Sequence, residues 1–480
     1  MNRRAKIIAT LGPASDDKSI IKELLIAGMD VARINFSHGD HQGHAQVIKN
    51  LREAAQELDH PVTILQDLSG PKIRTGMLTA GPVELVQGKE LILTTEEGDT
   101  SGGLIPVNFA DLALSVEVGG RILLDDGRLE LVVKNIQGNH IQTEIIQGGI
   151  LKSRKGINLP GAKLNIDSLT KKDLVDLEFG LSNDIDVLAL SFVRSADDIE
   201  RLRQEILRIN PEKKKLPIIA KLEHPDALVN LHEIIHAADG VMVARGDLGI
   251  EIPPETVPIE QKRIIAMANK HLCYVIVATQ MLDSMVDNPR PTRAEASDVA
   301  NAVLDGSDAV MLSGETAIGK YPVKTVEMMG SIIEQSEEHS DEWGRLNLDL
   351  TDDSSHDDAV SITRAARELA HERSVAAIAV FTRSGRTARL MSKARPRVPI
   401  LAFTPDLKTY RYLAMLWGTS PYLIPHAETI EEMIFHVDKA VIEGTPVEVG
   451  QEIVLIAGFP IHKMVPPNLA LLHTVKSIQS

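Results

Sequence analysis

The stretch ILQDLSGPKIRTG, residues 64–76, begins as a buried strand and ends in charges and turn residues. Its apolar residues surround Asp67, and glycine and proline then enclose two cations, Lys72 and Arg74. Glycine and proline interrupt regular structure. The stretch therefore places a carboxylate and two cations at the C-terminal end of one core strand, where the chain turns away.

Seven further apolar runs resemble this strand. With it, the eight are AKIIATL (5–11), DVARINF (30–36), VTILQDL (62–68), DVLALSF (186–192), LPIIAKLE (216–223), GVMVARGD (240–247), YVIVATQ (274–280) and AVMLSGE (309–315). Segments with helical periodicity, such as 19–29 and 196–209, lie between most of them. Eight strands alternating with helices predict an α/β fold, a parallel (β/α)8 TIM barrel.

The segment between the third and fourth runs is much longer than one helix requires. Its runs VELVQGKELILTT, GRILLDDGRLELVVKNI and HIQTEIIQGGIL alternate between apolar and polar residues. The Asp-Gly pair in LDDGRLEL indicates a tight hairpin turn. We therefore expect a small all-β lid domain, 71–166, inserted into a catalytic barrel formed by 1–70 and 167–342. It would lie over the C-terminal face, where barrel active sites form.

A third domain is expected at residues 345–480. A helical segment at 323–339 is followed by the acidic stretch 349–358, which is interpreted as a solvated linker with Asp358 capping the next helix. The runs SVAAIAVFT, VPILAFT and EIVLIAG then alternate with helical patterns. This order predicts a C-terminal α/β domain.

The composition argues against several classes of function. The formal net charge is -16 and only 3% of residues are aromatic, which disfavours a nucleic-acid-binding protein. No apolar run reaches the length of a membrane span and the N-terminus lacks the features of a signal peptide, so we expect a cytoplasmic protein. The single cysteine, Cys273, fits a reducing compartment and is interpreted as a buried, unreactive thiol.

Polar residues gather at the C-terminal ends of the expected strands. One charged residue at a strand end is usually the start of a solvated loop, but a barrel brings eight such ends to one cavity. The residues are Arg33, Asn35, Ser37, His38, Asp67, Lys72, Arg74, Lys221, Glu223, Arg245, Asp247, Thr279, Gln280, Ser313 and Glu315.

These residue types favour phosphoryl transfer. Glu223 and Asp247 offer the oxygen ligands that Mg²⁺ or Mn²⁺ prefers. Arg33, Arg74 and Lys221 supply cations for phosphate or carboxylate groups. A metal with several fixed cations suits a reaction that depends on positioning and charge neutralisation. The sequence contains no GxxxxGK[ST] motif, so a P-loop nucleotide site is excluded.

Two other interpretations have weaker support. His38, His41 and His44 are spaced three apart and suggest zinc, but two flank glycines in a loop and no cysteine assists them. Ser313 in LSGET resembles a nucleophile, but the GxSxG motif is absent.

Over nearly its whole length the chain resembles the pyruvate kinase family. The motifs that carry the resemblance occur in the family's order: KIIATLGPAS, ARINFSHG, DLSGPKIRTG, LDDG, KGINLPG, AKLEHPDAL, VMVARGDLGIEI, ATQMLDSM, PTRAEASDVANAVLDGSDAVMLSGETAIGKYP and TRSGRTARLMSK. The resemblance implies Mg²⁺-dependent phosphoryl transfer from phosphoenolpyruvate to ADP in glycolysis, giving pyruvate and ATP. It also implies a mobile β lid, a C-terminal regulatory domain and a homotetramer.

The resemblance also implies a role for each matching residue. The implied roles are phosphoryl contact and stabilisation (Arg33, Arg74, Lys221), divalent-metal binding (Glu223, Asp247), binding of the substrate carboxylate by backbone N–H groups (Gly246, Asp247), protonation of the enolate (Thr279) and support of the water network behind it (Ser313, Glu315). The implied nucleotide contacts are Asn35, His38 and Arg74 on the barrel side and Asp126 and Lys155 on the lid.

One departure from many relatives concerns K⁺. Relatives that need K⁺ bind it through residues matching Asn35, Ser37 and Asp67, with glutamate at the position of Lys72 and threonine at that of Leu68. A lysine there places a permanent ammonium beside the cation site, so K⁺ is expected not to be required. The alternative is a surface lysine on a loop.

A second departure concerns the effector. The loop TRSGRT resembles the family's site for an effector phosphate, and its residues are Thr382, Arg383, Ser384, Gly385, Arg386 and Thr387. The alternative is an ordinary turn from strand to helix. Many relatives carry a glycine-rich effector loop where this chain has AGFPIHKMVPPN (457–468), with His462 and Lys463. The effector therefore stays open between a monophosphorylated sugar, AMP and fructose 1,6-bisphosphate, and regulation can also have been lost.

Two rival functions stay open. A barrel lyase that handles phosphoenolpyruvate or pyruvate also places Glu and Asp on a metal, but it needs neither the lid nor Lys155. A degenerate kinase kept as a binding subunit should have lost one of Lys221, Glu223, Asp247 or Arg74, and all four are present.

Overall fold

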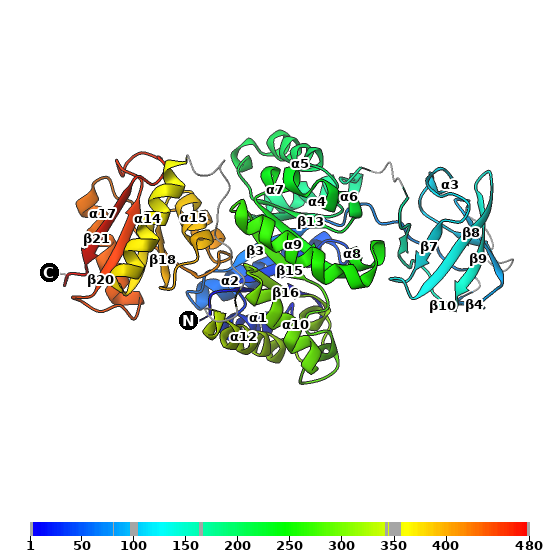
Figure 1. Ribbon diagram of the computed structural model, residues 1–480, viewed down its shortest axis with the longest axis horizontal. Coiled ribbons are helices and arrows are strands. Elements are labelled where there is room, and N and C mark those ends of the chain that lie inside the picture. The colour runs from blue at the N-terminus through cyan, green and yellow to red at the C-terminus, as the bar shows by residue number, and fades with distance from the viewer. Residues whose placement is uncertain are drawn as a thin grey trace.

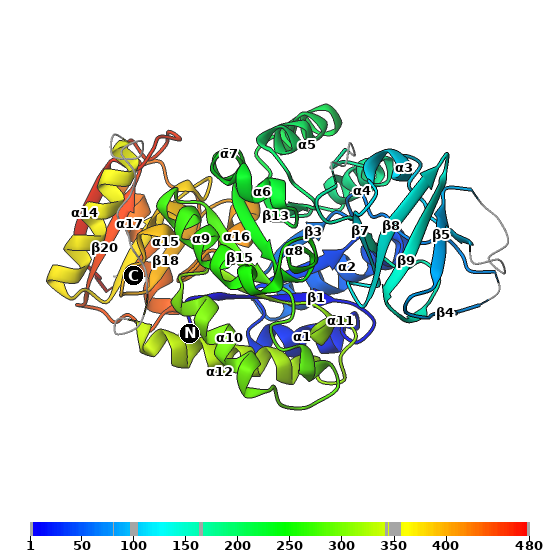
Figure 2. The same ribbon diagram turned by 45° about the vertical axis from the view of Figure 1, so that its right-hand side comes forward.

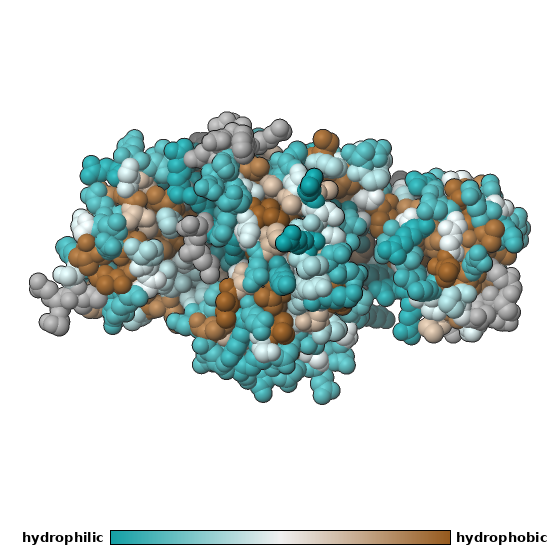
Figure 3. Space-filling model, turned by 90° about the horizontal axis from the view of Figure 1, so that it is seen from below, coloured by the Kyte–Doolittle hydropathy of each residue, from teal (hydrophilic) through white to brown (hydrophobic). Residues whose placement is uncertain are grey.

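The computed structural model describes residues 3–79, 81–96, 104–162, 167–340, 344 and 357–477. Its three parts lie in a row, with the barrel in the middle, the inserted β-domain at one end and the C-terminal α/β part at the other (Figure 1). Mostly hydrophilic residues, with smaller hydrophobic areas between them, cover the face seen from below (Figure 3). No helix in the described ranges is long and apolar enough to cross a membrane.

The middle part is a closed barrel of eight parallel strands, so the prediction of a TIM barrel is confirmed. Around the barrel the strands follow the order β1-β16-β15-β14-β13-β12-β3-β2. Their bounds are β1 (Lys6–Leu11), β2 (Val31–Asn35), β3 (Thr63–Asp67), β12 (Val187–Leu190), β13 (Ile218–Leu222), β14 (Gly240–Ala244), β15 (Tyr274–Ala278) and β16 (Ala309–Leu312). Nearly every residue of these strands is buried, because helices cover the outside and side chains fill the inside. This explains why the strands are continuous apolar runs in the sequence.

Helices connect the strands and surround the barrel (Figure 2). They are α1 (Lys18–Ala27), α2 (His41–Glu57), α4 (Lys171–Ser182), α5 (Ala196–Ile209), α6 (Pro225–Val229), α7 (Leu231–Ala237), α8 (Arg245–Glu251), α9 (Val257–Lys270), α10 (Arg293–Leu304), α11 (Gly314–Ala317) and α12 (Pro322–Glu338). Side-chain caps mark where several of them begin. In α10, for example, Thr292 and Glu295 form a capping box.

Between β3 and α4 the chain leaves the barrel and forms the inserted β-domain. Its six-stranded sheet has the order β11-β7-β8-β9-β5-β6, and β4 pairs with β10 beside it. The bounds are β4 (Val83–Leu85), β5 (Glu90–Thr94), β6 (Leu104–Pro106), α3 (Leu112–Ser115), β7 (Arg121–Leu124), β8 (Leu129–Gln137), β9 (His140–Gln147), β10 (Gly149–Leu151) and β11 (Ile157–Asn158). Asp125, Asp126 and Gly127 have positive φ in the turn between β7 and β8, as the Asp-Gly pair predicted.

The C-terminal part is a five-stranded sheet of order β19-β18-β17-β20-β21, in which only β21 runs antiparallel to its neighbour. Its elements are α14 (Asp358–Arg373), β17 (Ala377–Phe381), α15 (Arg386–Ala394), β18 (Ile400–Thr404), α16 (Leu407–Leu413), β19 (Thr419–Leu423), α17 (Ile430–Gly444), β20 (Glu452–Ala457) and β21 (Leu469–Thr474). The prediction of an α/β fold here is confirmed.

The predicted helix cap at Asp358 is wrong by one residue. The side chain of Asp357 caps α14 by accepting a hydrogen bond from the Ala359 N–H at 2.8 Å, and Asp358 is already the first helical residue. The predicted domain limits at 166, 342 and 345 and the acidic segment 349–356 lie outside the described residues.

Buried charges join the barrel to the C-terminal part. Asp308, directly before β16, is fully buried. Its carboxylate binds the Lys393 ammonium at 2.8 Å and the Arg395 guanidinium at 2.7 Å. The Tyr274 hydroxyl donates a hydrogen bond to the Met415 carbonyl at 2.6 Å. Because Asp308 and Tyr274 lie where strands begin, the C-terminal part is fixed against the N-terminal face of the barrel.

Cys273 lies near this interface and is buried. Burial raises the pKa of its thiol to about 12, so the thiol stays protonated at neutral pH. This agrees with the interpretation of Cys273 as an unreactive structural residue.

We expect Asp308→Ala to lower the free energy of unfolding by about 3–5 kcal/mol, because Lys393 and Arg395 would be left as buried charges without the carboxylate that neutralises them. Urea unfolding followed by circular dichroism measures the change. Asp287→Ala is the control, because it removes an exposed ion pair to Lys320 and should change the free energy by less than about 1 kcal/mol. Equal effects of the two substitutions would contradict this account of the interface.

Candidate active site

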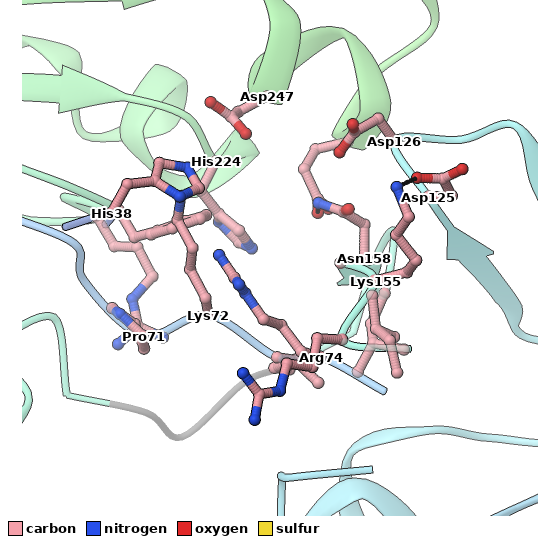
Figure 4. Close-up of a pocket in the computed structure, with 18 residues that line it drawn as sticks. His38, Pro71, Lys72, Arg74, Asp125, Asp126, Lys155, Asn158, His224 and Asp247 are labelled. Carbon is pink, nitrogen blue, oxygen red and sulfur yellow. Dashed lines mark hydrogen bonds and ion pairs between the residues drawn. The ribbon is translucent and has the colours of Figure 1, made fainter. Parts of the chain in front are cut away.

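The C-terminal ends of the barrel strands face the inserted β-domain across a cavity of about 400 Å³. Asp247 and His38 line the barrel side, while Asp126 and Lys155 line the side of the inserted domain (Figure 4). A neighbouring hollow of about 830 Å³ shares Asp126 and Asp247 with it and is lined further by Gly246, Thr279, Ser313 and Glu315. The barrel therefore collects most of the residues predicted from the sequence around two adjoining cavities.

Lys221 is the centre of a buried cluster of charges. Its ammonium lies 3.1 Å from the Asp67 carboxylate and 2.9 Å from that of Glu223. Burial alone would favour the neutral amine, but Asp67 and Glu223 raise the pKa of Lys221, so it stays charged.

Asp67 also binds Arg33. The Arg33 Nε and Nη2 atoms each lie 2.7 Å from Asp67 Oδ2, and Nη1 donates to the Thr10 hydroxyl at 2.9 Å. Although burial opposes ionisation, Lys221 and Arg33 hold the pKa of Asp67 below its usual value. One carboxylate thus orients two cations at the ends of β2 and β13.

Two residues after β12 complete this cluster, and neither was predicted from the sequence. The Ser191 hydroxyl accepts a hydrogen bond from the Lys221 ammonium at 2.7 Å and donates one to the Leu68 carbonyl at 2.7 Å. The Phe192 N–H donates to the second carboxylate oxygen of Glu223 at 2.8 Å, and Phe192 has a φ of 54°. Ser191 could have been predicted from the sequence, because it lies near the end of an apolar run, as the other site residues do.

Glu223 directly follows β13, and Asp247 lies in α8, just after the neighbouring strand β14, so the two carboxylates can share a divalent cation. Burial raises the pKa of Glu223 and the Asp247 charge raises it further, against the opposing effect of Lys221. A cation between the two carboxylates would relieve this repulsion. Two carboxylates with room for further ligands in the cavity fit Mg²⁺ or Mn²⁺.

Thr279 follows β15 in a left-handed conformation, with φ of 70°, and Gln280 follows with φ of 54°. A β-branched residue rarely adopts positive φ, so this backbone is strained. The Gly246 N–H donates to the Thr279 hydroxyl at 2.7 Å. Arg245 holds the strained turn in place by donating to the Thr279 carbonyl at 2.8 Å and by its ion pair with Asp298 at 2.7 Å.

Ser313 and Glu315 follow β16 beside this turn. The buried Glu315 carboxylate accepts hydrogen bonds from the Ser313 N–H at 2.6 Å and the Leu282 N–H at 3.2 Å. Burial raises the pKa of Glu315. Glu315 therefore ties the loop after β15 to the loop after β16.

The inserted β-domain contributes a second group of polar side chains. The Lys155 ammonium lies 2.6 Å from the Asp125 carboxylate. The Asn158 amide donates to the Glu251 carboxylate of α8 at 2.9 Å, which joins the domain to the helix that carries Asp247. Asp125, Asn158 and Glu251 were not predicted, although all three lie within the motifs LDDG, KGINLPG and VMVARGDLGIEI.

His38 lies in the cavity between the two parts, together with Lys72 and Arg74 (Figure 4). Burial, followed by the charges of Lys72, Arg74 and Arg33, lowers the pKa of His38, which favours the neutral ring. His41 instead stacks on Phe179 and pairs with Asp176, and His44 packs against Phe36. The three histidines therefore serve separate contacts, and the zinc interpretation has no support.

The residues of the expected monovalent-cation site lie near one another. Asn35 is in register with Asp67 on the neighbouring strand, and its side-chain oxygen accepts a hydrogen bond from the Ser37 N–H at 3.0 Å. Burial and the nearby Lys221 lower the pKa of Lys72, while Asp247, Glu223 and Asp67 favour its charged form. Lys72 thus lies within electrostatic range of the central charges.

The loop 382–387 joins β17 to α15 and lines a separate hollow of about 270 Å³. The Gly385 N–H donates to the Thr382 hydroxyl at 3.0 Å, and Arg383 donates to the His462 carbonyl at 3.3 Å. Lys463 and, from the barrel, Lys215 also line the hollow. It is therefore a hydroxyl-rich, cationic hollow formed by two parts of the chain.

The comparisons with known proteins agree with this arrangement. The family model for the pyruvate kinase barrel domain matches residues 2–326, and that for the pyruvate kinase alpha/beta domain matches residues 360–473. Pyruvate kinase of Geobacillus stearothermophilus is 44% identical over 484 residues, which cover 100% of this chain and 81% of that protein. Pyruvate kinase of Mycobacterium tuberculosis is 42% identical over 476 residues, 99% of each chain.

A solved structure gives the same result. The crystal structure of a pyruvate kinase from Cryptosporidium parvum superposes with a TM-score of 0.90 at 35% sequence identity, covering 99% of this chain and 96% of that one. The chain belongs to the pyruvate kinase family.

Proposed function

We propose that the protein transfers the phosphoryl group of phosphoenolpyruvate to ADP, giving pyruvate and ATP, and that the reaction requires Mg²⁺ or Mn²⁺. The observation that carries the proposal is the Lys221 ammonium, which is held between Asp67 and Glu223 and lies within electrostatic range of Asp247. Asp247 lines a cavity whose opposite wall carries Lys155. A lyase would have no use for that opposite wall. A degenerate subunit would have no need for a fully assembled charge cluster.

Fixed cations explain how the chain would stabilise the transition state. Negative charge on the moving phosphoryl group would be neutralised by Arg33 and Lys221, which Asp67 already orients, so little reorganisation would be needed. Glu223 and Asp247 would hold the divalent metal, which supplies further charge neutralisation when bound. Ser191 acts as a positioning residue for Lys221.

The strained turn after β15 would serve the second step of the reaction, in which the enolate is protonated to give pyruvate. The backbone N–H groups of Gly246 and Asp247 would bind the substrate carboxylate, with the Gly246 N–H giving up its hydrogen bond to the Thr279 hydroxyl. Thr279 would then assist protonation of the enolate. Ser313 and Glu315 would hold the loops around it and support its water network.

The nucleotide would bind between the barrel and the inserted β-domain. Asn35, His38 and Arg74 would contact it from one side, and Asp126 and Lys155 from the other. Lys155 would exchange its contact with Asp125 for a phosphate. Because Asn158 binds Glu251 of α8, movement of the inserted domain as a lid would be transmitted to the helix that carries Asp247. We also propose that the protein works in the cytoplasm as a homotetramer.

Lys221→Met should reduce turnover on the order of 10³-fold without loss of the fold, because the fixed cation at the developing charge is removed. A coupled assay of pyruvate and ATP formation measures turnover, and circular dichroism checks the fold. Lys320→Met, which removes an exposed lysine, is the matched control and should keep full activity. Near-wild-type turnover of the Lys221 variant, or cleavage of a carbon–carbon bond without ATP formation, would contradict the proposal.

We further propose that the enzyme does not require K⁺, because the Lys72 ammonium supplies the charge that K⁺ would bring to Asn35, Ser37 and Asp67. The proximity of Lys72 to the carboxylates of Asp67, Glu223 and Asp247 supports this. The buried Leu68, next to Asp67, supports it as well, because it is apolar where K⁺-dependent relatives have threonine.

Replacing K⁺ by a tetraalkylammonium salt should therefore leave wild-type turnover within about twofold. Lys72→Glu should lose activity by on the order of 10-fold or more in that salt and recover it when K⁺ is added, because a carboxylate restores the need for a cation. Steady-state kinetics in both salts measure this. If wild-type turnover collapses without K⁺, Lys72 does not have this role.

A phosphorylated allosteric effector is proposed to bind at the segment Thr382, Arg383, Ser384, Gly385, Arg386 and Thr387, of which all but Gly385 line the hollow. Hydroxyl and N–H groups with Lys463 and Lys215 suit a phosphate, and Lys215 links the hollow to the barrel. A sugar monophosphate and AMP remain candidates beside fructose 1,6-bisphosphate.

One of these compounds should raise activity at low phosphoenolpyruvate concentration, and Ser384→Asp should abolish the effect, because it adds a negative charge where the phosphate would bind. Basal activity should be unchanged. Steady-state assays with each compound measure the response, and Ser331→Asp on the exposed side of α12 is the control. Activation that survives in the Ser384 variant, or a complete absence of any response, would contradict the assignment.

A further inference from the structure

Three histidines cluster on the barrel far from the C-terminal ends of its strands. His232 and His236 lie on α7, and His271 directly follows α9, shortly before β15 begins. Their candidate ligand nitrogens all lie within 4.8 Å of one another. Within the ranges that the structure describes, this is the only group of three or more His, Cys, Asp or Glu side chains so arranged.

The rings face one another from two separate elements. Their centroids are 4.3 Å apart for His232 and His236, 5.0 Å for His232 and His271, and 4.6 Å for His236 and His271. His232 and His236 are exposed and His271 is half-buried, so an ion and its water ligand can reach the group from solvent.

Hydrogen bonding already selects one ring tautomer. Nδ1 of His236 lies 2.7 Å from the backbone carbonyl of His232. A carbonyl can only accept, so Nδ1 carries the proton and Nε2 keeps its lone pair for a metal. Metal-binding histidines commonly use their second nitrogen in this way.

The sequence spacing suits the same chemistry. In HEIIH, residues 232–236, the two histidines are four apart and lie on one face of the helix. Glu233 lies about 100° around the helix from His232 and is exposed, so it is outside the ligand group. Three imidazoles without a carboxylate suit Zn²⁺, Ni²⁺ or Cu²⁺, whereas Mg²⁺ prefers oxygen.

The distances require only a small adjustment. Tetrahedral Zn²⁺ with bonds of about 2.0–2.1 Å places its ligand nitrogens about 3.3 Å apart. The nitrogens therefore need to approach by at most about 1.5 Å, a movement within reach of rotation about the side-chain bonds of exposed histidines.

We propose that His232, His236 and His271 form a binding site for one transition-metal ion of the zinc type, with water as the fourth ligand. The site is separate from Glu223 and Asp247 and does not depend on the proposed reaction. A bound ion ties α7 to the segment between α9 and β15. His236 lies three residues before Asp239, and the Asp239 carboxylate binds the Arg389 guanidinium of the C-terminal part at 3.4 Å.

The test is calorimetric titration of the metal-stripped, full-length protein with ZnCl₂. Millimolar MgCl₂ is present throughout, so that the carboxylates of the candidate active site are occupied. We expect one site per chain, weakened at least 10-fold in His236→Gln and in His271→Gln. His426→Gln, which changes an exposed histidine elsewhere, should bind Zn²⁺ like the wild type.

Two further measurements distinguish Zn²⁺ bound at these three histidines from Zn²⁺ bound elsewhere on the chain. Co²⁺ should produce the visible absorption of a four-coordinate site in the wild type and not in the two variants. Zn²⁺ should raise the thermal midpoint of the wild type alone, since an ion that binds only the folded state stabilises it. Absence of a one-to-one site, or equal Zn²⁺ affinity in the variants and the wild type, would overturn the proposal.

Discussion

The buried carboxylate of Asp67 is the interaction on which the candidate site depends. It lies at the end of β3, the last strand before the chain leaves the barrel, and it binds both Arg33 and Lys221. Burial and the neighbouring charge of Arg33 both oppose the charge on Lys221. Asp67 offsets both effects, so Lys221 stays charged, and Asp67 holds both cations in place without a bound substrate.

The same strand end also explains the position of the inserted β-domain. Because the chain departs directly after Asp67, Lys72 and Arg74 line the cavity between the barrel and the domain, together with Asp247. The chain returns through Asn158, which binds Glu251 of α8. The inserted domain is therefore linked to the charge cluster at its exit and to the helix of Asp247 at its return.

The opposite face of the barrel has a different physical character. Asp308 neutralises Lys393 and Arg395 in an interior contact, and such a contact resists separation because breaking it would leave buried charges. At the C-terminal face, charged residues such as Lys72, Arg74 and Asp247 line a cavity and can meet a ligand. Charge at the N-terminal face is buried and suited to joining two parts of the chain.

The sequence by itself determined the strands and which polar side chains lie at their C-terminal ends. Strands of a parallel barrel are buried on both sides and appear as apolar runs, and their C-terminal ends converge whatever the details of packing. This is why Lys221, Glu223, Asp247 and Thr279 could be predicted, as could the hairpin at Asp125 and Asp126. Only the tertiary structure decided which groups meet. Ser191 and Phe192 bind Lys221 and Glu223 across some 30 residues of sequence, and His271, just after the end of α9, approaches His232 and His236 on α7. Local periodicity reflects the burial of each element, whereas contacts between elements depend on packing distances that no local pattern contains.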